Sequence, residues 1–226
     1  MVSVEEIKKE KLRTGYTTGT SATAAAKAAL LSIINQTKIE NVDVKLPKGD
    51  FIKIPIHLCQ FDKNGAKCSV IKDGGDDPDV THGAEIVVEL SFTDKINEIE
   101  IDGGEGVGIV TKPGLGLELN KAAINPVPKK MINENLREIT DKHLVKKGIK
   151  VIISVPKGKE LGPKTDNPRI GILNGISILG TSGIVIPFST ASYAASIRQN
   201  IDVAIAMGND TVVLTTGGRS EDFAKK

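Results

Sequence analysis

The sequence predicts a mixed α+β and α/β fold divided into two domains. Residues 1–148 are predicted to form a β-rich α+β domain with an alanine-rich helix near its start, because several strand patterns follow one another between residues 42 and 100. Residues 149–226 are predicted to form a Rossmann-like layered α/β domain, because apolar strand patterns there alternate with small-residue loops and helix patterns. The last helix pattern has just begun at residue 226, so we expect the second domain to be incomplete at its C-terminus.

An alanine- and leucine-rich helix is predicted over residues 22–34, with Thr20 or Ser21 as its N-cap. A helix N-terminus presents unpaired amide groups at the positive end of its dipole, which suits a ligand carboxylate. This predicts substrate binding by Thr17, Thr18, Thr20 and Ser21. The alternative is a capped helix that packs closely on a sheet. The substitution Thr18→Val distinguishes the two. It should leave the cap and the melting temperature unchanged, and it should lower activity only if Thr18 binds the ligand.

Four strands are predicted between residues 42 and 100, namely VDVKL, FIKIPIHLCQF, AKCSVIK and AEIVVELSF. An Asn64-Gly65 turn joins two of them, and a two-residue loop there places Cys59 opposite Val70. We therefore expect Cys59 and Cys68 to be reduced core residues that do not face each other. The three histidines pair with neither cysteine at a metal-ligand spacing, so no protein-bound metal is expected.

An acidic loop, DGGDDPDVTHG, spans residues 73–83 between two of these strands. Paired carboxylates in such a loop can bind Mg²⁺ or supply a base. A solvated loop is the alternative that the Asp, Pro and Gly content favours. The carboxylates belong to Asp73, Asp76, Asp77 and Asp79.

Three glycine-rich loops are candidate cofactor sites, because a loop without bulky side chains lets a ligand approach the backbone. The same loops can also be ordinary tight turns. The run DGGEGVG has the spacing D-x-G-x-G-x-G and resembles the glycine loop of common S-adenosylmethionine enzymes, but a strand pattern and a Pro-Gly pair follow it instead of a helix. The residues predicted to bind the cofactor are Gly180, Thr181, Ser182, Gly183, Thr216, Gly217, Gly218, Gly104, Gly106 and Gly108.

Basic residues lie in or beside the same motifs. The loop PKGKELGPKTDNPR follows the apolar run KVIISV at the carboxyl end of a predicted strand, where open α/β sheets bind ligands. A solvated basic loop is the alternative. The candidate cationic contacts for an anionic substrate are Arg13, Lys112, Lys164, Arg169 and Arg219.

Charge and composition argue against several classes of function. Lys and Arg number 30 against 28 Asp and Glu, and aromatic residues make up 3% of the chain, so neither a nucleic-acid surface nor a base-stacking platform is expected. Residues 1–19 are charged and polar and no 18-residue apolar span follows, so we expect a cytoplasmic protein without membrane contact. The sequence is compatible with a homo-oligomer.

Five motifs occur in order along residues 13–221: TGYTTGTSATAAAKAAL, DGGEGVGIVTKPGL, AINPVPKKMI, GISILGTSGIVIP and TTGGRSE. Together they resemble the CbiD family. The resemblance implies a cobalt-precorrin-5B C-1-methyltransferase of anaerobic cobalamin biosynthesis, with S-adenosylmethionine as co-substrate. Its small-molecule substrate would be a corrinoid, and cobalt would enter only as part of that substrate. The resemblance also implies a fold other than the usual corrin-methyltransferase fold.

Two features depart from the family. Its members usually carry Cys where this chain has Ser21, and they continue well past the TTGGR motif.

The chemistry that the resemblance implies agrees with these residue types. A corrinoid intermediate carries many carboxylates, which basic residues and helix N-termini bind. A sulfonium donor is already activated, so the protein mainly aligns two reactants, and we assign no catalytic residue.

Two other classes of function are open at this point. One is a phosphate- or nucleotide-handling small-molecule enzyme, although the sequence lacks G-x-x-x-x-G-K-[ST]. The other is a non-catalytic tetrapyrrole-binding protein. Binding of S-adenosylmethionine, S-adenosylhomocysteine and ATP distinguishes them, because a methyltransferase binds the first two, a kinase binds the third and a carrier binds none.

Overall fold

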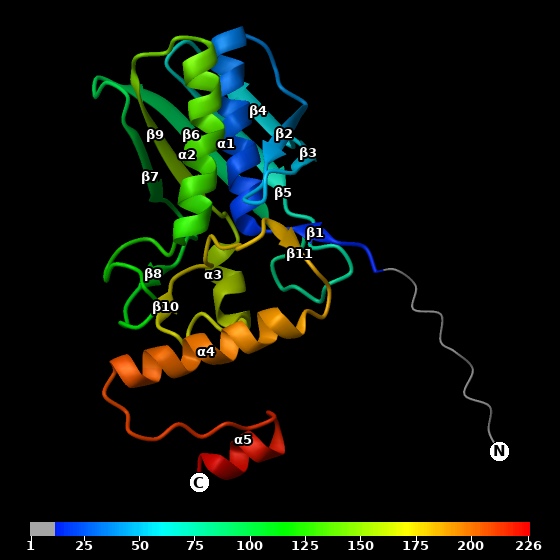
Figure 1. Cartoon of the computed structure of the whole chain (residues 1–226), viewed down its shortest axis with the longest axis vertical. Helices are drawn as coiled ribbons and strands as arrows, with labels where there is room; N and C mark the ends of the chain where they lie inside the picture. Colours follow the sequence, from blue (N-terminus) through cyan, green and yellow to red (C-terminus); the bar gives the residue numbers. More distant parts are fainter. Residues whose placement is uncertain (1–11) are drawn as a thin grey trace, which may run out of the picture.

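The computed structural model describes residues 12–226 (Figure 1). Most of the N-terminal stretch on which the expected location depends lies outside these residues. In chain order the elements are β1 (Gly15–Tyr16), α1 (Thr18–Asn35), β2 (Asn41–Lys45), β3 (Phe51–Pro55), β4 (Leu58–Phe61), β5 (Gly65–Ile71), β6 (Glu85–Thr93), β7 (Ile99–Gly103), β8 (Ile109–Val110), α2 (Pro126–Lys142), β9 (Gly148–Ser154), α3 (Gly158–Leu161), η1 (Gly162–Lys164), β10 (Ile172–Leu173), β11 (Ile184–Val185), α4 (Thr190–Ala206) and α5 (Arg219–Ala224).

A five-stranded mixed sheet has the order β4-β5-β6-β9-β7. Neighbouring strands run antiparallel except β7 and β9, which run parallel. Alternation of apolar residues sets the register, because Val88 of β6 lies opposite Ile153 of β9 and both are fully buried. The strand predicted from KVIISV is therefore β9, with one antiparallel and one parallel neighbour.

The position of β9 bears directly on the predicted division into two domains. It pairs with β6 and β7, which belong to the first 148 residues. The later strands β10 and β11 have two residues each and pair antiparallel with β8 and β1. The structure is thus a mixed α/β fold around one five-stranded sheet. It does not confirm a layered Rossmann-like unit, and the boundary near Gly148 stays a prediction.

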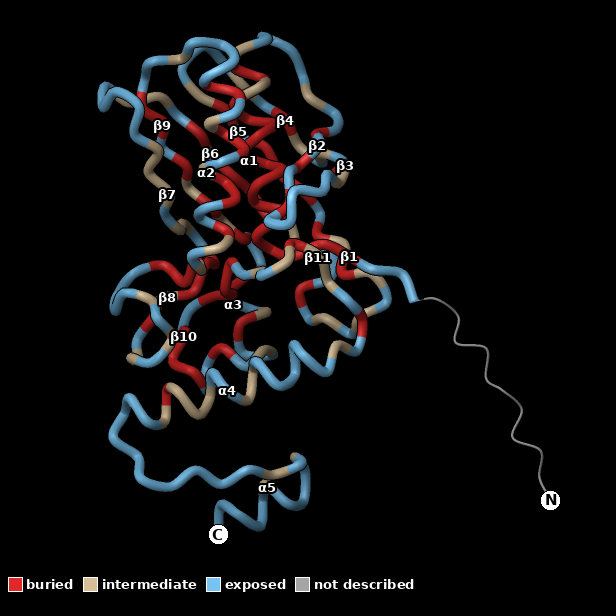
Figure 2. The backbone as a smooth tube through the Cα atoms, viewed as in Figure 1, coloured by how far each residue is buried: buried red, intermediate tan, exposed pale blue. Residues whose placement is uncertain are grey.

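Helices α1 and α2 lie side by side against this sheet (Figure 1). Helix α1 begins at Thr18 because Thr17, and not Thr20 or Ser21, is its N-cap: Thr17 Oγ1 accepts a hydrogen bond from the Thr20 amide at 3.2 Å. The alanines between residues 22 and 29 are fully buried, as the red core in Figure 2 shows. Their small side chains let the helix lie close to the sheet and to α2.

The β4–β5 hairpin brings two cysteines together. Cys59 lies directly opposite Cys68, so the expected pairing of Cys59 with Val70 is wrong. The reason is the turn, in which the Asp62 carboxylate accepts hydrogen bonds from the amides of Asn64-Gly65 at 2.7 and 2.9 Å, lengthening the loop and shifting the register. Both thiols are free and buried, and burial raises the pKa of the Cys68 thiol well above its ordinary value.

The C-terminal part is mostly exposed. Helix α4 lies between the cavity-bearing part and α5 (Figure 1), and Val203 is its one buried residue. The β-branched run over residues 211–214 forms no strand, because nothing in residues 12–226 pairs with it; Val213 is 66% exposed and Leu214 is 68% exposed. Within residues 12–226 no helix has the length and apolar character that a membrane crossing needs.

Candidate functional site

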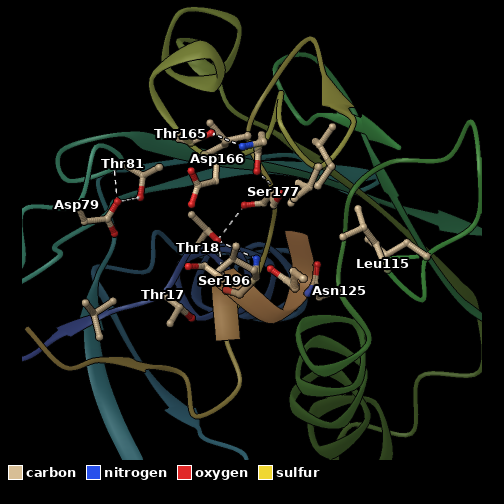
Figure 3. Close-up of a pocket in the computed structure, with 18 of the residues that line it drawn as sticks. Thr17, Thr18, Asp79, Thr81, Leu115, Asn125, Thr165, Asp166, Ser177 and Ser196 are labelled. Atoms are coloured by element: carbon tan, nitrogen blue, oxygen red, sulfur yellow. Dashed lines mark hydrogen bonds between the residues drawn. The ribbon is translucent and has the colours of Figure 1, made fainter. Parts of the chain in front are cut away.

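A cavity of about 270 Å³ lies where the N-terminus of α1, the loop after β5, the loops on either side of β10 and helix α4 meet (Figure 3). Its wall combines hydroxyl, carboxylate and amide groups with apolar side chains. Concave sites that are mainly apolar and carry a few placed polar groups are typical of small-molecule binding. We therefore take this cavity as the candidate site.

A buried ion pair forms one part of the wall. Lys72 is 2% exposed, and its Nζ donates to Asp79 Oδ2 at 2.6 Å. The other carboxylate oxygen accepts hydrogen bonds from the Thr81 amide at 2.7 Å and hydroxyl at 2.6 Å. Lys72 was not predicted as a site residue, although alternation along AKCSVIK places it on the same inward face as Cys68 and Val70.

Two competing effects set the charge of Asp79. Burial favours the neutral acid and would raise its pKa, but the nearby Lys72 ammonium and the hydrogen bonds from Lys72 and Thr81 outweigh burial. The pKa of Asp79 therefore lies below its ordinary value. At neutral pH the cavity wall thus contains an ionised carboxylate next to an ammonium.

The rest of the acidic loop is occupied by contacts with the protein. Asp73 forms an ion pair with Arg13, whose hydrogen bond lowers the pKa of the Asp73 carboxyl, and Asp76 accepts the Arg13 amide at 2.6 Å. Asp77 accepts the Phe188 amide at 2.9 Å. In residues 12–226 no three His, Cys, Asp or Glu side chains gather closely enough to hold a metal ion.

A polar corner of the cavity follows η1. Asn167 is 7% exposed; it donates to the Gly175 carbonyl at 3.2 Å and accepts the Ser177 hydroxyl at 3.0 Å. These bonds fix the segment that also carries Asp166, whose carboxylate faces the cavity in Figure 3. The position after a strand predicted a site here, but the residues predicted from this loop were the basic Lys164 and Arg169 and not the Asp166-Asn167 pair.

Apolar side chains complete the wall. Leu115, Leu117, Ile170 and Ile172 line the cavity, and Ile170 and Ile172 belong to a small buried cluster that includes Val203 of α4. This part of the wall was not predicted from sequence, because it is assembled from a loop, a turn and a two-residue strand in separate parts of the chain. It offers an apolar surface to a ligand.

The residues at the start of α1 divide into two groups. Thr17 and Thr18 line the cavity, whereas Thr20 and Ser21 are fully buried behind it. Thr20 Oγ1 donates to the Gly183 carbonyl at 2.7 Å, and Ser21 Oγ donates to the Thr17 carbonyl at 3.0 Å. Their hydroxyls therefore hold protein groups together, and a role for Thr20 and Ser21 toward a substrate stays a prediction.

The first-turn donors of α1 also bond to the protein. The Gly19 amide donates to the Leu179 carbonyl at 3.0 Å, and the Thr20 amide bonds to Thr17. Thr18 Oγ1 accepts the Leu179 amide at 2.9 Å and lies within 3.2 Å of the Leu179 carbonyl. This end of the helix is thus attached to the segment before the Gly180 loop.

The loop of Gly180, Thr181, Ser182 and Gly183 packs on α1. The Thr17 amide donates to the Gly183 carbonyl at 3.1 Å, and both glycines have positive φ. A side chain on Gly180 would overlap that of Thr17. The protein itself therefore requires these glycines, and the loop is absent from the cavity wall. Cofactor binding by these residues stays a prediction.

The loop of Gly104, Gly106 and Gly108 has a similar structural role. The Ile176 amide donates to the Gly106 carbonyl at 3.0 Å, and the Gly108 amide donates to the Ile176 carbonyl at 2.9 Å. Gly106 has φ +72°, and a Cβ there would overlap the Val155 carbonyl. The loop holds the backbone of Ile176, which lines the cavity.

The other predicted site residues lie away from the cavity wall. Lys112 Nζ donates to the Arg169 carbonyl at 3.2 Å, and the Arg169 guanidinium pairs with Glu221 of α5 at 3.2 Å. Lys164 ends η1, next to the cavity-lining Thr165, and Arg219 begins α5. The remaining predicted residues, on the exposed approach to α5, are Thr216, Gly217 and Gly218.

Comparisons with known proteins agree with the motifs. The CbiD family model matches residues 5–187. The chain is 54% identical over 218 residues to a protein of Geobacillus sp. (strain WCH70) and 52% identical over 225 residues to one of Priestia megaterium. Both are named cobalt-precorrin-5B C(1)-methyltransferase. These matches cover 96% and 99% of this chain but 60% and 61% of the relatives, so the chain spans about three fifths of their length.

A solved structure is also similar. The crystal structure of a cobalamin biosynthesis protein from Archaeoglobus fulgidus is 31% identical, with a TM-score of 0.59, and the match covers 95% of this chain and 67% of that one. The fold, the ordered motifs and the family model all point to the same relatives. The chain belongs to the CbiD family.

Proposed function

We propose that the chain takes part in methylation of ring carbon C-1 of cobalt-precorrin-5B, giving cobalt-precorrin-6A in anaerobic cobalamin biosynthesis. The observation that carries this proposal is identity above 50% over nearly the whole chain to proteins named for that reaction. S-adenosylmethionine is the methyl donor in the proposed reaction. The corrinoid is the small-molecule substrate, and its cobalt arrives with it.

Methyl transfer from a sulfonium donor needs no nucleophilic side chain on the protein. The methyl–sulfur bond of the sulfonium breaks as the methyl–carbon bond forms, and S-adenosylhomocysteine leaves as a neutral thioether. Alignment of the two reactants is then the main contribution of the protein, worth roughly 7–11 kcal/mol in well-oriented reactions. This agrees with a cavity wall that offers hydroxyl, amide and carboxylate groups but no Ser/His or Cys/His pair among its residues.

We assign the donor to this cavity and the corrinoid to the surface outside it. The charged side chains of the wall are Lys72, Asp79 and Asp166, for a formal charge of +1 − 2 = −1. That charge suits a cationic sulfonium compound and opposes a macrocycle with many carboxylates. The basic residues outside the cavity are the proposed substrate contacts: Arg13, Lys112, Lys164, Arg169 and Arg219.

Calorimetry with S-adenosylmethionine, S-adenosylhomocysteine and ATP tests the assignment. We expect the first two to bind and ATP not to bind. Binding of ATP alone would favour a nucleotide-handling enzyme, and binding of none of the three would favour a tetrapyrrole carrier. Incubation with cobalt-precorrin-5B and the donor should then give a product heavier by one methyl group, detected by mass spectrometry.

A further inference from the structure

The two ends of the cavity differ in chemistry. Figure 3 shows Asp79 and Thr81 on one side and Leu115 on the other, with Asp166 and Ser177 between them. The first side carries the ion pair with Lys72, and the opposite side carries leucine. An elongated ligand with one charged end and one apolar end matches this arrangement.

The charged end retains hydrogen-bonding capacity. An ammonium has three N–H donors, and among residues 12–226 Lys72 Nζ has one hydrogen-bond partner, Asp79 Oδ2. The Lys72 side chain is 2% exposed and lines the cavity, so its remaining donors have access to little besides the cavity. Asp79 Oδ2 accepts one bond from Lys72 and has a second lone pair.

The charge of a suitable ligand end follows from this pair. A lone carboxylate that approached Lys72 would be repelled by Asp79, and a lone ammonium that approached Asp79 would be repelled by Lys72. A zwitterionic α-amino acid avoids both repulsions, because its carboxylate can meet the lysine while its ammonium meets the aspartate. The cavity end is therefore complementary to an amino-acid zwitterion.

We propose that Lys72 and Asp79 bind the α-amino-acid end of the methyl donor, with its adenosyl end toward Leu115, Ile170 and Ile172. This assignment rests on the proposed function. In this orientation the adenine ring contacts apolar side chains. The Asp166 carboxylate, between the two ends, accepts hydrogen bonds from the ribose hydroxyls.

The first test changes the ligand and leaves the protein intact. S-adenosylhomocysteine carries the whole amino-acid end, its decarboxylated analogue lacks the carboxylate, and 5′-methylthioadenosine lacks both charged groups. Calorimetry on the unmodified chain should show S-adenosylhomocysteine binding at least tenfold more tightly than either analogue. Equal affinity for all three would overturn the assignment, because the amino-acid end would then have no charged partner.

The second test removes both charges together, in Lys72→Met/Asp79→Asn, so that neither side chain is left as an unpaired buried charge. The affinity of the double variant for S-adenosylhomocysteine should fall at least tenfold, to the level of its affinity for 5′-methylthioadenosine. Its affinity for 5′-methylthioadenosine should equal that of the parent. The matched control is Lys67→Met/Glu89→Gln, which removes an exposed pair 2.9 Å apart on β5 and β6. It should bind all ligands as the parent does.

The outcomes separate this inference from the proposed function. If the parent prefers S-adenosylhomocysteine but the double variant keeps that preference, the amino-acid end lies elsewhere while donor binding stands. If both ligands weaken equally in the double variant, the pair only shapes the cavity and the inference is wrong. If the parent binds none of the adenosyl compounds, the donor assignment itself fails. A double variant that does not fold leaves the ligand series on the parent to decide.

Discussion

The core between helix α1 and the sheet and the loops around the cavity are held together in different ways. In the first region, apolar side chains fill the space between α1 and the sheet. Leu30 of α1, Ile86 of β6 and Ile153 of β9 are fully buried. The alanines of α1 bring the helix close to the sheet without filling the space that these larger side chains need. This region resembles an ordinary helix-on-sheet core, and its stability comes mainly from burial of apolar surface.

Around the cavity, backbone contacts backbone. The Val155 amide donates to the Glu105 carbonyl at 2.7 Å, and the Ile176 amide donates to the Gly106 carbonyl at 3.0 Å. Glycine takes the place that alanine has in α1, because a Cβ at Gly106 would overlap the Val155 carbonyl. Small residues thus serve close packing in both regions, and in the second region they surround the cavity whose wall carries hydroxyl, amide and carboxylate groups.

The largest expected effect comes from opening a void in the first region. Leu30→Ala deletes a fully buried side chain of α1 and should destabilise the protein by about 3–5 kcal/mol, from lost burial and the cavity left behind. Chemical denaturation measures it. Leu144→Ala, where the side chain is 81% exposed, is the control and should change little. A cost for Leu30→Ala below about 1 kcal/mol would contradict the proposed packing of α1.

Gly106→Ala tests whether backbone contact holds the second region. Alanine at φ +72° is strained, and its Cβ would overlap the Val155 carbonyl, so we expect a loss of roughly 2–4 kcal/mol. Gly116→Ala is the matched control, because φ is +66° and nothing lies within 4 Å of the added Cβ. The difference between the two variants isolates the backbone contact, and equal costs would show that strain in φ alone matters.

Thr18→Val tests the contact between the start of α1 and Leu179, which connects the two regions. The sequence predicts no change in stability, but the structure places Thr18 Oγ1 within hydrogen-bonding distance of the Leu179 amide and carbonyl. Loss of the hydrogen bond to this part-buried amide should cost about 1 kcal/mol, so the melting temperature should fall. Thr23→Val is the control, because within residues 12–226 the Thr23 hydroxyl donates to the Gly19 carbonyl of its own helix and to no other element. An unchanged melting temperature in Thr18→Val would restore the sequence prediction.

Acid should weaken the ion pairs of Asp73 and Asp79. The pKa values of Asp73 and Asp79 both lie below the ordinary 3.8, so their stabilising contribution is fully present above pH 3.8 and is lost as the pH falls through the lowered values. The stability advantage of the parent over Lys72→Met/Asp79→Asn should therefore shrink below pH 3.8. An advantage that grows with acidification would contradict this direction. Urea denaturation at pH 6 and pH 3 measures it.

Local patterns predicted the first region well. The strands predicted from VDVKL, AKCSVIK, AEIVVELSF and KVIISV form near their predicted positions. The run FIKIPIHLCQF, predicted as one strand, instead forms β3 and β4, which belong to different sheets. The patterns did not predict which strands pair. Strand β9 lies between β6 and β7 in the five-stranded sheet. Strand pairing is set by contacts distant in sequence, which periodicity does not report.

The candidate site was predicted only in part. Thr17 and Thr18 line the cavity, whereas Lys72, Asp79 and Asp166 were not selected as site residues. The glycine-rich loops were predicted to bind a cofactor because glycine permits close approach, but the groups that approach them in the structure belong to the protein: the Val155 carbonyl at Gly106 and the Thr17 side chain at Gly180. Sequence alone cannot tell a ligand from backbone as the neighbour of a glycine.

The smallest expected effect separates the structure from the predicted Rossmann-like domain. In that domain Val213 would lie in a buried strand, and Val213→Ala would cost about 1.5–3 kcal/mol. The structure leaves Val213 66% exposed in a segment without regular structure, so the cost should stay within about 0.5 kcal/mol. Val151→Ala, at a fully buried position in β9, supplies the matched control and should show the full loss. Thermal and urea denaturation of the two variants measure both costs. Equal losses of stability in the two variants would mean that Val213 is buried against a partner in solution. The C-terminal region would then be packed as closely as the sheet.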